Sequence, residues 1–326
     1  MYIVVADSSR LIREYVSKQI LERGNTLIEF SNGLEVYDYI TSKKPMDILL
    51  TSLELPEVSG LELCWEANVR SMDGEPNYTI VMSSSSNLET LVEALDSGAD
   101  DFLKKPFVKE ELHARLRAAE RTVSAQRELM RLANNDNLTN ISNRRDFFNK
   151  IDKSLFNSTK REDSSMIILD LDDFKRINDA YGYKFGDKFL VAIAQAVAQE
   201  HQILGRLSGG QFGVYLPQTT EEQAYAFAEK IRKNISNIQI KFDNKSVSVT
   251  VSVGVYTSKK KEGSEAIACF TSQALNAAKY SGHNHTVVWG SLEHQASVET
   301  TSSVQGYDHL QEKTADLSSH LRALQP

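Results

Sequence analysis

Residues 165–179 read SMIILDLDDFKRIND, a short apolar run followed directly by a block rich in acidic residues. Ser165–Leu169 has the length and composition of a buried β-strand. The block opens at Asp170, and the backbone amides around Asp173–Lys175 stand at an expected helix start, which suits them to bind phosphate. This stretch therefore predicts a strand followed by a helix, with acidic residues where the two meet.

A β-hairpin is expected on the C-terminal side of this stretch. Residues 206–212 read RLSGGQF, and Gly209 and Gly210 favour a tight turn. The turn is expected to join strands at Ile203–Leu207 and Phe212–Leu216.

Five motifs along this half of the chain resemble those of GGDEF domains, the domains of diguanylate cyclases. They are DNLTNISNRRDF (136–147) for the entry motif DxLTGLxNRRxF, the block at 170–187 for DxDxFKxxND…GD, RLSGGQF in the place of RxGGDEF or RxGGEEF, VSVTVSVGV (247–255) for the strand VTxSxGV, and residues 273–284 for the helix ADxALYxAKxxGRN. The resemblance implies a palm-like α/β domain over residues 137–290, with a partly antiparallel sheet like that of nucleotidyl cyclases.

The resemblance also implies a nucleotide site. It assigns Asp170 to a metal ion, Asn178 and Asp187 to guanine, and Lys279 to a phosphate. An amide and a carboxylate can satisfy the donor and acceptor edge of guanine. His283 stands where the family has an arginine, and an imidazole is a weaker, pH-dependent substitute. The candidate ligands are GTP or GDP with Mg²⁺.

The signature departs from the family pattern. Its positions are Ser208, Gly209, Gly210, Gln211 and Phe212. Gly210 has no side chain where the family has a metal-binding carboxylate, and Gln211 offers an amide with neither charge nor basicity. Losing this metal arrangement should slow the reaction on the order of 10³-fold or more. We therefore expect a degenerate GGDEF domain with no catalytic residues, a protein that is not an enzyme and that requires no cofactor.

The first 120 residues alternate short apolar strands with helices, which predicts a doubly wound parallel sheet. Strands are expected at Tyr2–Ala6, Leu27–Phe30, Asp47–Thr51 and Thr79–Met82, and helices at Leu11–Arg23, Leu34–Ile40, Gly60–Val69 and Leu88–Ser97. The series VVADSSR, LELPEVSGLEL, VMSSSS and SGADDFLKKPF resembles a response-regulator receiver domain. The resemblance implies a flavodoxin-like fold over residues 1–120.

The receiver resemblance also assigns a pocket. It implies that Asp7 is the remaining member of an acidic pair, that Ser52 stands at the phospho-acceptor position, and that Ser83 and Lys105 fill the hydroxyl and lysine positions. An acyl phosphate needs a carboxylate nucleophile beside a bound metal ion, and serine provides neither. We therefore expect a pseudo-receiver whose pocket is held by hydrogen bonds and by Lys105 pairing with Asp7 or Glu54.

A helical connector is expected over residues 108–136. Its seam of residues in steps of four and three consists of Leu112, Leu116, Ala119, Val123, Gln126, Met130 and Ala133. Two interpretations stay open, a helix packed on its own receiver and a two-stranded coiled coil that makes a homodimer. The seam outruns the receiver without a Pro or Gly break, which favours the homodimer, although Gln126 would weaken it.

The composition indicates a cytoplasmic protein. The net charge of -7 argues against nucleic acid as a partner, and the chain has no apolar run of membrane-spanning length and no signal peptide pattern. Cys64 and Cys269 are expected to be reduced. Residues 291–326 form a polar tail in which a short amphipathic helix is one alternative and a disordered end another.

These features favour a catalytically inactive regulatory or scaffolding protein in bacterial cyclic di-GMP or two-component signalling. The expected partners are a cyclase, an EAL-type phosphodiesterase or a sensor kinase assembly. Two alternatives remain open, an allosteric sensor that binds GTP or GDP through the retained guanine site, and a weak diguanylate cyclase.

Overall fold

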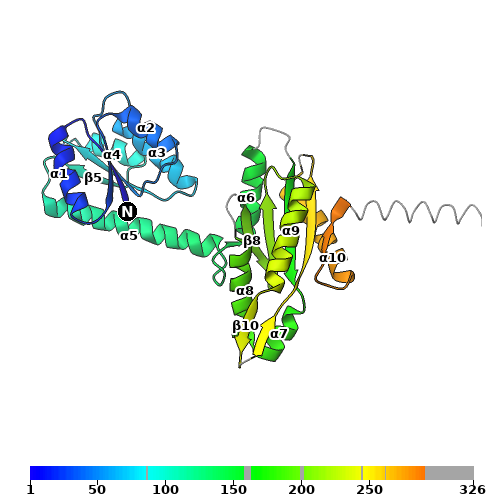
Figure 1. Cartoon of the computed structure of the whole chain (residues 1–326). Coiled ribbons are helices and arrows are strands. Elements are labelled where there is room, and N and C mark those ends of the chain that lie inside the picture. The colour runs from blue at the N-terminus through cyan, green and yellow to red at the C-terminus, as the bar shows by residue number, and fades with distance from the viewer. Residues whose placement is uncertain (86, 158–162, 199–201, 244, 261, 291–326) are drawn as a thin grey trace, which may run out of the picture. The chain divides into compact units, whose positions relative to one another are not determined.

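The chain is divided into two compact units, Met1–Ala133 and a second unit that begins at Asn134 (Figure 1). A computed structural model describes residues 1–85, 87–157, 163–198, 202–243, 245–260 and 262–290. Each unit has a β-sheet and a hydrophobic core of its own.

The first unit is a parallel five-stranded sheet in the order β2-β1-β3-β4-β5. Its strands are β1 (Tyr2–Ala6), β2 (Thr26–Phe30), β3 (Ile48–Ser52), β4 (Tyr78–Ser83) and β5 (Asp101–Lys104). Its helices are α1 (Arg10–Leu21), α2 (Gly33–Thr41), α3 (Gly60–Met72), α4 (Leu88–Asp96) and α5 (Lys109–Asn134). The predicted doubly wound parallel sheet is confirmed, with the helix ends displaced by a few residues.

Helices cover both faces of this sheet. Side chains of α1 and α5 pack with Ile3 and Val5 on one face, and side chains of α2 and α3 pack with Val4 on the other. Successive strand residues point to opposite faces, so a strand buried on both sides must be apolar throughout. This requirement explains the unbroken apolar run that opens the chain.

The first half of α5 belongs to the core of the first unit. Its buried residues are Leu112, Leu116, Ala119 and Val123. Further along the helix, Arg127 forms an ion pair with the buried Asp47, which lies just before β3. The predicted seam is therefore packed on its own unit as far as Val123. Leu129 and Leu132 are exposed beyond this point and lie outside the predicted seam, and the homodimer stays a prediction.

The second unit is a mixed six-stranded sheet in the order β13-β12-β7-β9-β8-β6. Its strands are β6 (Ser142–Asn143), β7 (Ser164–Leu171), β8 (Ile203–Ser208), β9 (Gln211–Leu216), β12 (Val251–Ser258) and β13 (Thr286–Val288), and a separate antiparallel pair is formed by β10 (Gln239–Phe242) and β11 (Lys245–Ser248). Its helices are α6 (Arg144–Asn157), α7 (Phe174–Tyr181), α8 (Tyr183–Val197), α9 (Glu221–Ser236) and α10 (Ser264–Tyr280). The expected partly antiparallel α/β sheet is confirmed, because β7 is antiparallel to both of its neighbours.

Two predicted elements of this unit are wrong in their extent. The strand expected over residues 247–255 is divided, because its first part, β11, pairs with β10, whereas its second part, β12, pairs with β7. The helix expected over residues 273–284 begins at Ser264 and ends at Tyr280. Gly282 stops it by adopting a φ of 107°, a conformation that ends helices.

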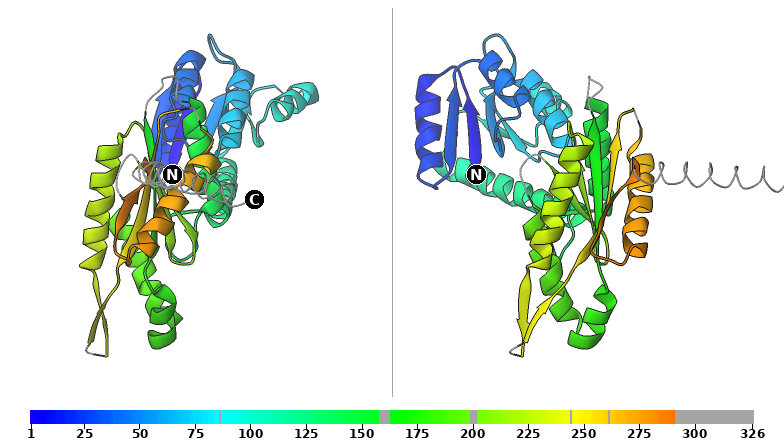
Figure 2. Two further views of the ribbon diagram at one scale, coloured as in Figure 1. Left: turned by 90° about the vertical axis from the view of Figure 1, so that its right-hand side faces the viewer. Right: turned by 45° about the vertical axis from the view of Figure 1, so that its right-hand side comes forward.

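Helices also cover both faces of the second sheet. Helices α8 and α9 lie on one face of the sheet, and α6 and α10 lie on the other (Figure 2). The side chains of each pair form a core with the sheet. Gly254 on β12 permits the close approach of α10, since a Cβ there would lie 2.3 Å from the backbone nitrogen of Leu275. The packing brings the last turn of α10, which carries Lys279, to the end of β7.

Cys64 and Cys269 are free thiols. Burial raises the pKa of Cys64 to about 12, whereas Cys269 is exposed on α10. Within the described ranges, no helix has the length and apolar character needed to cross a membrane. The predicted tail at 291–326 lies outside the described residues.

Candidate functional site

Asp170, the predicted metal ligand, lies at the end of β7 between two neighbouring strands. Its register partners are Gln211 on β9 and Ser252 on β12. Lys279 Nζ lies 2.8 Å from Asp170 Oδ2, and Gln211 Nε2 lies 3.4 Å from the same oxygen. The carboxylate therefore has a cation and an amide as partners, both supplied by the chain itself.

Asp172, the second carboxylate in this stretch, is buried and fully engaged in hydrogen bonds. Its Oδ1 accepts from Ser252 Oγ at 2.6 Å, and its Oδ2 accepts from Thr250 Oγ1 at 2.7 Å and from the Asn284 amide at 3.0 Å. A buried carboxylate needs such donors to replace its water. Asp172 thus fixes the loop after α10 to the end of β7. Sequence reasoning assigned it no role, because partners more than 70 residues away leave no local signal.

The signature hairpin has the predicted form, with β8 and β9 joined at Gly209 and Gly210. Arg206 Nη1 donates to both carboxylate oxygens of Asp136 at 3.0 and 3.2 Å, while its Nε and Nη2 donate to the Gly209 carbonyl at 3.0 and 2.7 Å. Burial alone would raise the pKa of Asp136, but the bonds from Thr139 and Arg206 outweigh it and lower the pKa. Arg206 therefore connects the hairpin turn to the entry motif. Both residues stand in recognised motifs, but their pairing was not predicted.

The predicted guanine residues, Asn178 and Asp187, lie on consecutive helices, α7 and α8. Gly182 joins the helices with a φ of 83°, a conformation that favours glycine. The Asn178 amide packs over Gly186, where a Cβ would lie 2.0 Å from Asn178 Oδ1. This oxygen is buried and has no hydrogen-bond donor among the described residues, a deficit of about 1–3 kcal/mol. Asp187, which follows Gly186 in α8, is half-buried.

His283, the second predicted phosphate residue, is exposed in the loop after α10 and has a φ of 63°. The loop is held from α9, because Arg232 Nη1 donates to Asn284 Oδ1 at 2.7 Å and to its carbonyl oxygen at 3.2 Å. Glu229 binds Arg232 in turn, and this bond, with one from Thr286, lowers the pKa of Glu229 to about 2. Sequence reasoning missed Glu229 and Arg232, which stand outside the recognised motifs.

These residues do not fit a pair of magnesium ions. Mg²⁺ requires nearly octahedral oxygen ligation and is usually bound through one or two carboxylates together with water and phosphate. Here Asp170 is paired with Lys279, the oxygens of Asp172 are occupied, and Gly210 has no side chain. In the part of the chain that the structure describes, no three His, Cys, Asp or Glu residues form a group that could hold a metal ion.

Three of the four predicted pocket residues of the first unit come together. Lys105 Nζ forms an ion pair with Asp7 and donates to Ser52 Oγ at 2.9 Å. The Asp7 side chain is 2% exposed and that of Lys105 is 11% exposed, so this pair is buried. Ser83 Oγ accepts a bond of 3.1 Å from a backbone amide two residues later. Of the two carboxylates expected to pair with Lys105, Asp7 does so, and Glu54 is exposed.

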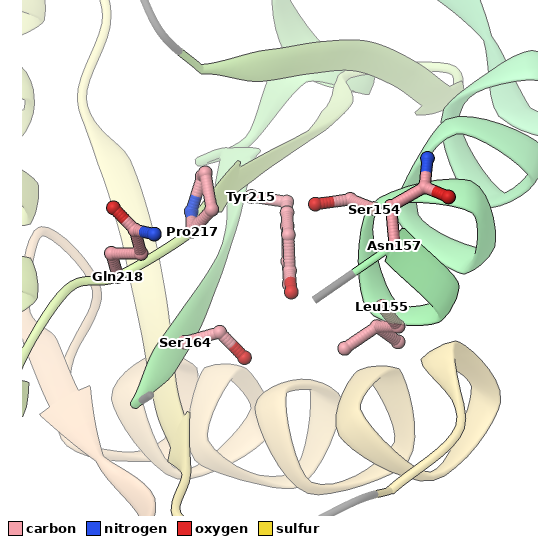
Figure 3. Close-up of a pocket in the computed structure, with 7 residues that line it drawn as sticks. All are labelled: Ser154, Leu155, Asn157, Ser164, Tyr215, Pro217 and Gln218. Carbon is pink, nitrogen blue, oxygen red and sulfur yellow. The ribbon is translucent and has the colours of Figure 1, made fainter. Parts of the chain in front are cut away.

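A separate cavity of 370 Å³ lies where β7 begins and β9 ends, and Figure 3 shows the residues that line it. Ser154, Ser164, Tyr215 and Gln218 are among the residues that line it, and burial raises the pKa of Tyr215. No predicted nucleotide residue lines this cavity. The candidate site is therefore the region around Asp170, Asn178 and Lys279.

Comparison with known families matches each unit to one of them. Residues 3–117 match the response regulator receiver domain, and residues 133–285 match the diguanylate cyclase GGDEF domain. The chain is 28% identical to response regulator PleD of Caulobacter vibrioides over 266 residues, which cover 76% of this chain and 58% of PleD. It is 33% identical over 173 residues to the probable diguanylate cyclase DgcT of Escherichia coli K12, which is 51% of this chain and 38% of DgcT.

Among solved structures, the coiled coil and GGDEF domain of DgcB from Caulobacter crescentus, in complex with c-di-GMP, is 27% identical with a TM-score of 0.49. This likeness covers 54% of the present chain and 98% of that one. The chain spans less than two thirds of the length of the curated relatives PleD and DgcT.

The expectation of a degenerate protein that is not an enzyme is contradicted by these comparisons. The relatives of the second unit include proteins named as diguanylate cyclases from Escherichia coli and Vibrio cholerae. The expectation gave too much weight to two signature positions against the agreement of the whole domain. The chain therefore carries a response regulator receiver domain at residues 3–117 and a GGDEF domain at residues 133–285.

Proposed function

We propose that this chain is a cyclic di-GMP signalling protein whose GGDEF domain binds GTP or GDP and communicates the bound state to a protein partner. The two family matches support the pathway. Asn178 and Asp187, which the family uses to bind guanine, support GTP or GDP as the ligand. The partner classes that fit are a cyclase, an EAL-type phosphodiesterase and a sensor kinase assembly.

The observation that carries this proposal is the unsatisfied Asn178 oxygen beside Asp187. A buried acceptor without a donor gains a full hydrogen bond when a ligand supplies one after a small rotation of the amide. Guanine offers N–H donors on its Watson–Crick edge, which an amide oxygen and a carboxylate together can accept. Adenine presents a different pattern, so the site should distinguish GDP from ADP.

Asp187→Ala should weaken GDP binding roughly 10- to 100-fold, because a hydrogen bond to a charged acceptor is worth about 1.5–3 kcal/mol. Calorimetric titration of the full chain measures this loss. The matched control is Asp179→Ala, which removes an exposed carboxylate from α7 and should bind GDP as the native chain does. Equal affinities for GDP and ADP would contradict the proposal.

The family reaction, formation of cyclic di-GMP from GTP, is a second candidate. The relatives named as diguanylate cyclases favour it, as does the retention of Asp170 and Lys279. Incubation with labelled GTP and chromatographic separation of the product test it. A cyclic product that forms with the native chain and is lost in Asp170→Asn would establish the activity.

For the receiver domain we infer that acetyl phosphate and beryllofluoride leave the conformation unchanged. Ser52 stands in the place of the acceptor carboxylate, and Lys105 is already bonded to Ser52 and Asp7. Amide NMR spectra recorded with increasing beryllofluoride and Mg²⁺ measure the response. A saturable shift centred on Ser52 would refute the inference.

A further inference from the structure

The candidate nucleotide site contains a cation that belongs to the chain. Lys279 Nζ lies 2.8 Å from Asp170 Oδ2. The Lys279 side chain is 36% exposed, and that of Asp170 is 20% exposed. An ammonium group has three donors, and the bond to Asp170 uses one of them. Lys279 is therefore anchored by one hydrogen bond while it keeps donors available to an incoming anion.

A divalent cation at this place would meet unfavourable surroundings. To bind Asp170 it would have to displace Lys279 or lie close to it, and like charges at such distances repel. Asp172 is buried and already accepts bonds of 2.6, 2.7 and 3.0 Å, which weakens it as a metal ligand, and Gly210 has no side chain to contribute. Gln211 Nε2 presents an amide donor to the same carboxylate, which again stabilises the metal-free arrangement.

The phosphates of a nucleotide require positive charge, and Lys279 already supplies it. We propose that this site binds the phosphate groups of a guanine nucleotide through the Lys279 ammonium without a divalent cation. The inference rests on the proposed guanine binding and adds that this binding requires no divalent cation.

Calorimetric titration of the full chain with GDP, in EDTA and in excess Mg²⁺, tests the inference. GDP should bind in EDTA, and excess Mg²⁺ should leave the affinity unchanged or lower it, because free Mg²⁺ competes with Lys279 for the phosphates. Binding that appears only with Mg²⁺ would overturn the inference and leave the guanine site standing. Failure of both GDP and guanosine to bind under either condition would overturn the proposed function as well.

Lys279→Met provides the second measurement. In EDTA this variant should weaken GDP binding at least about 10-fold, because one charge-assisted hydrogen bond to the phosphates is lost. Guanosine, which has no phosphate, should bind as it does to the native chain. Mg²⁺ should strengthen GDP binding to this variant, because Asp170 is released from its ion pair. The matched control is Lys230→Met, at an exposed lysine of α9. Unchanged GDP affinity in Lys279→Met would refute the assignment of the cation.

Discussion

Gly210→Glu should raise the rate of cyclic di-GMP formation from GTP on the order of 10²-fold or more, because it adds a second carboxylate beside Asp170. The Gly210 carbonyl accepts a bond of 3.2 Å from the Leu171 amide, so the new side chain would start next to the end of β7. A Cβ at position 210 would lie 3.2 Å from Leu171 Cβ and 3.4 Å from Phe174 Cδ1. These contacts require a shift of a few tenths of an ångström, which a hairpin tip can accommodate. With two carboxylates, the site would bind Mg²⁺ in preference to the single positive charge of Lys279.

Gly210→Gln is the matched control for this prediction, because it adds the same bulk without the charge. It should leave the rate at the native value, and Asp170→Asn in the Gly210→Glu background should remove the gain. Product formation from labelled GTP measures all of these variants. Equal rates for Gly210→Glu and Gly210→Gln would show that the missing carboxylate does not limit the reaction.

Lys105→Met should destabilise the receiver domain by about 3–5 kcal/mol, because it leaves the buried carboxylate of Asp7 without its counter-charge. Asp7 would keep the bond of 2.8 Å from the Ser9 amide, which cannot replace an ammonium group. Urea unfolding, followed by a signal specific to the receiver domain, measures the loss.

The neighbouring Lys104 is exposed, and Lys104→Met should change the free energy of unfolding by less than about 0.5 kcal/mol. The double variant Asp7→Asn, Lys105→Met should regain much of the lost stability, because it removes both charges of the pair. A loss in Lys105→Met no larger than that in Lys104→Met would show that the ion pair contributes little.

The parts of the fold that were predicted correctly have local causes. The apolar run from Ile3 to Ala6 and the helical periodicity after it lie within single elements, so a short window contains the whole signal. The hairpin at Gly209 and Gly210 was predictable for the same reason, since two adjacent glycines specify a tight turn. The extent of the strands was less predictable, because β11 and β12 are separated by a change of pairing partner, from β10 to β7, which a short window of sequence does not contain.

The contacts of the candidate site depend on long-range pairing. Lys279 and Asp170 are separated by 109 residues, and the sequence indicates each role without indicating that they bind each other. The resemblance to GGDEF domains placed Asn178 and Asp187, but only packing reveals that the Asn178 oxygen lacks a donor. The wrong expectation about enzymatic activity arose at Gly210 and Gln211, where two missing carboxylates were taken to decide the character of the entire domain.

The contrast between the two thiols offers a practical route to these measurements. The thiolate is the reactive form of cysteine, and a thiol with a pKa of about 12 is almost wholly protonated at neutral pH. A maleimide dye should therefore attach to Cys269 and spare Cys64 as long as the protein is folded. Cys269 and Lys279 share α10, so a fluorophore can be placed on the helix that carries Lys279 without mutagenesis.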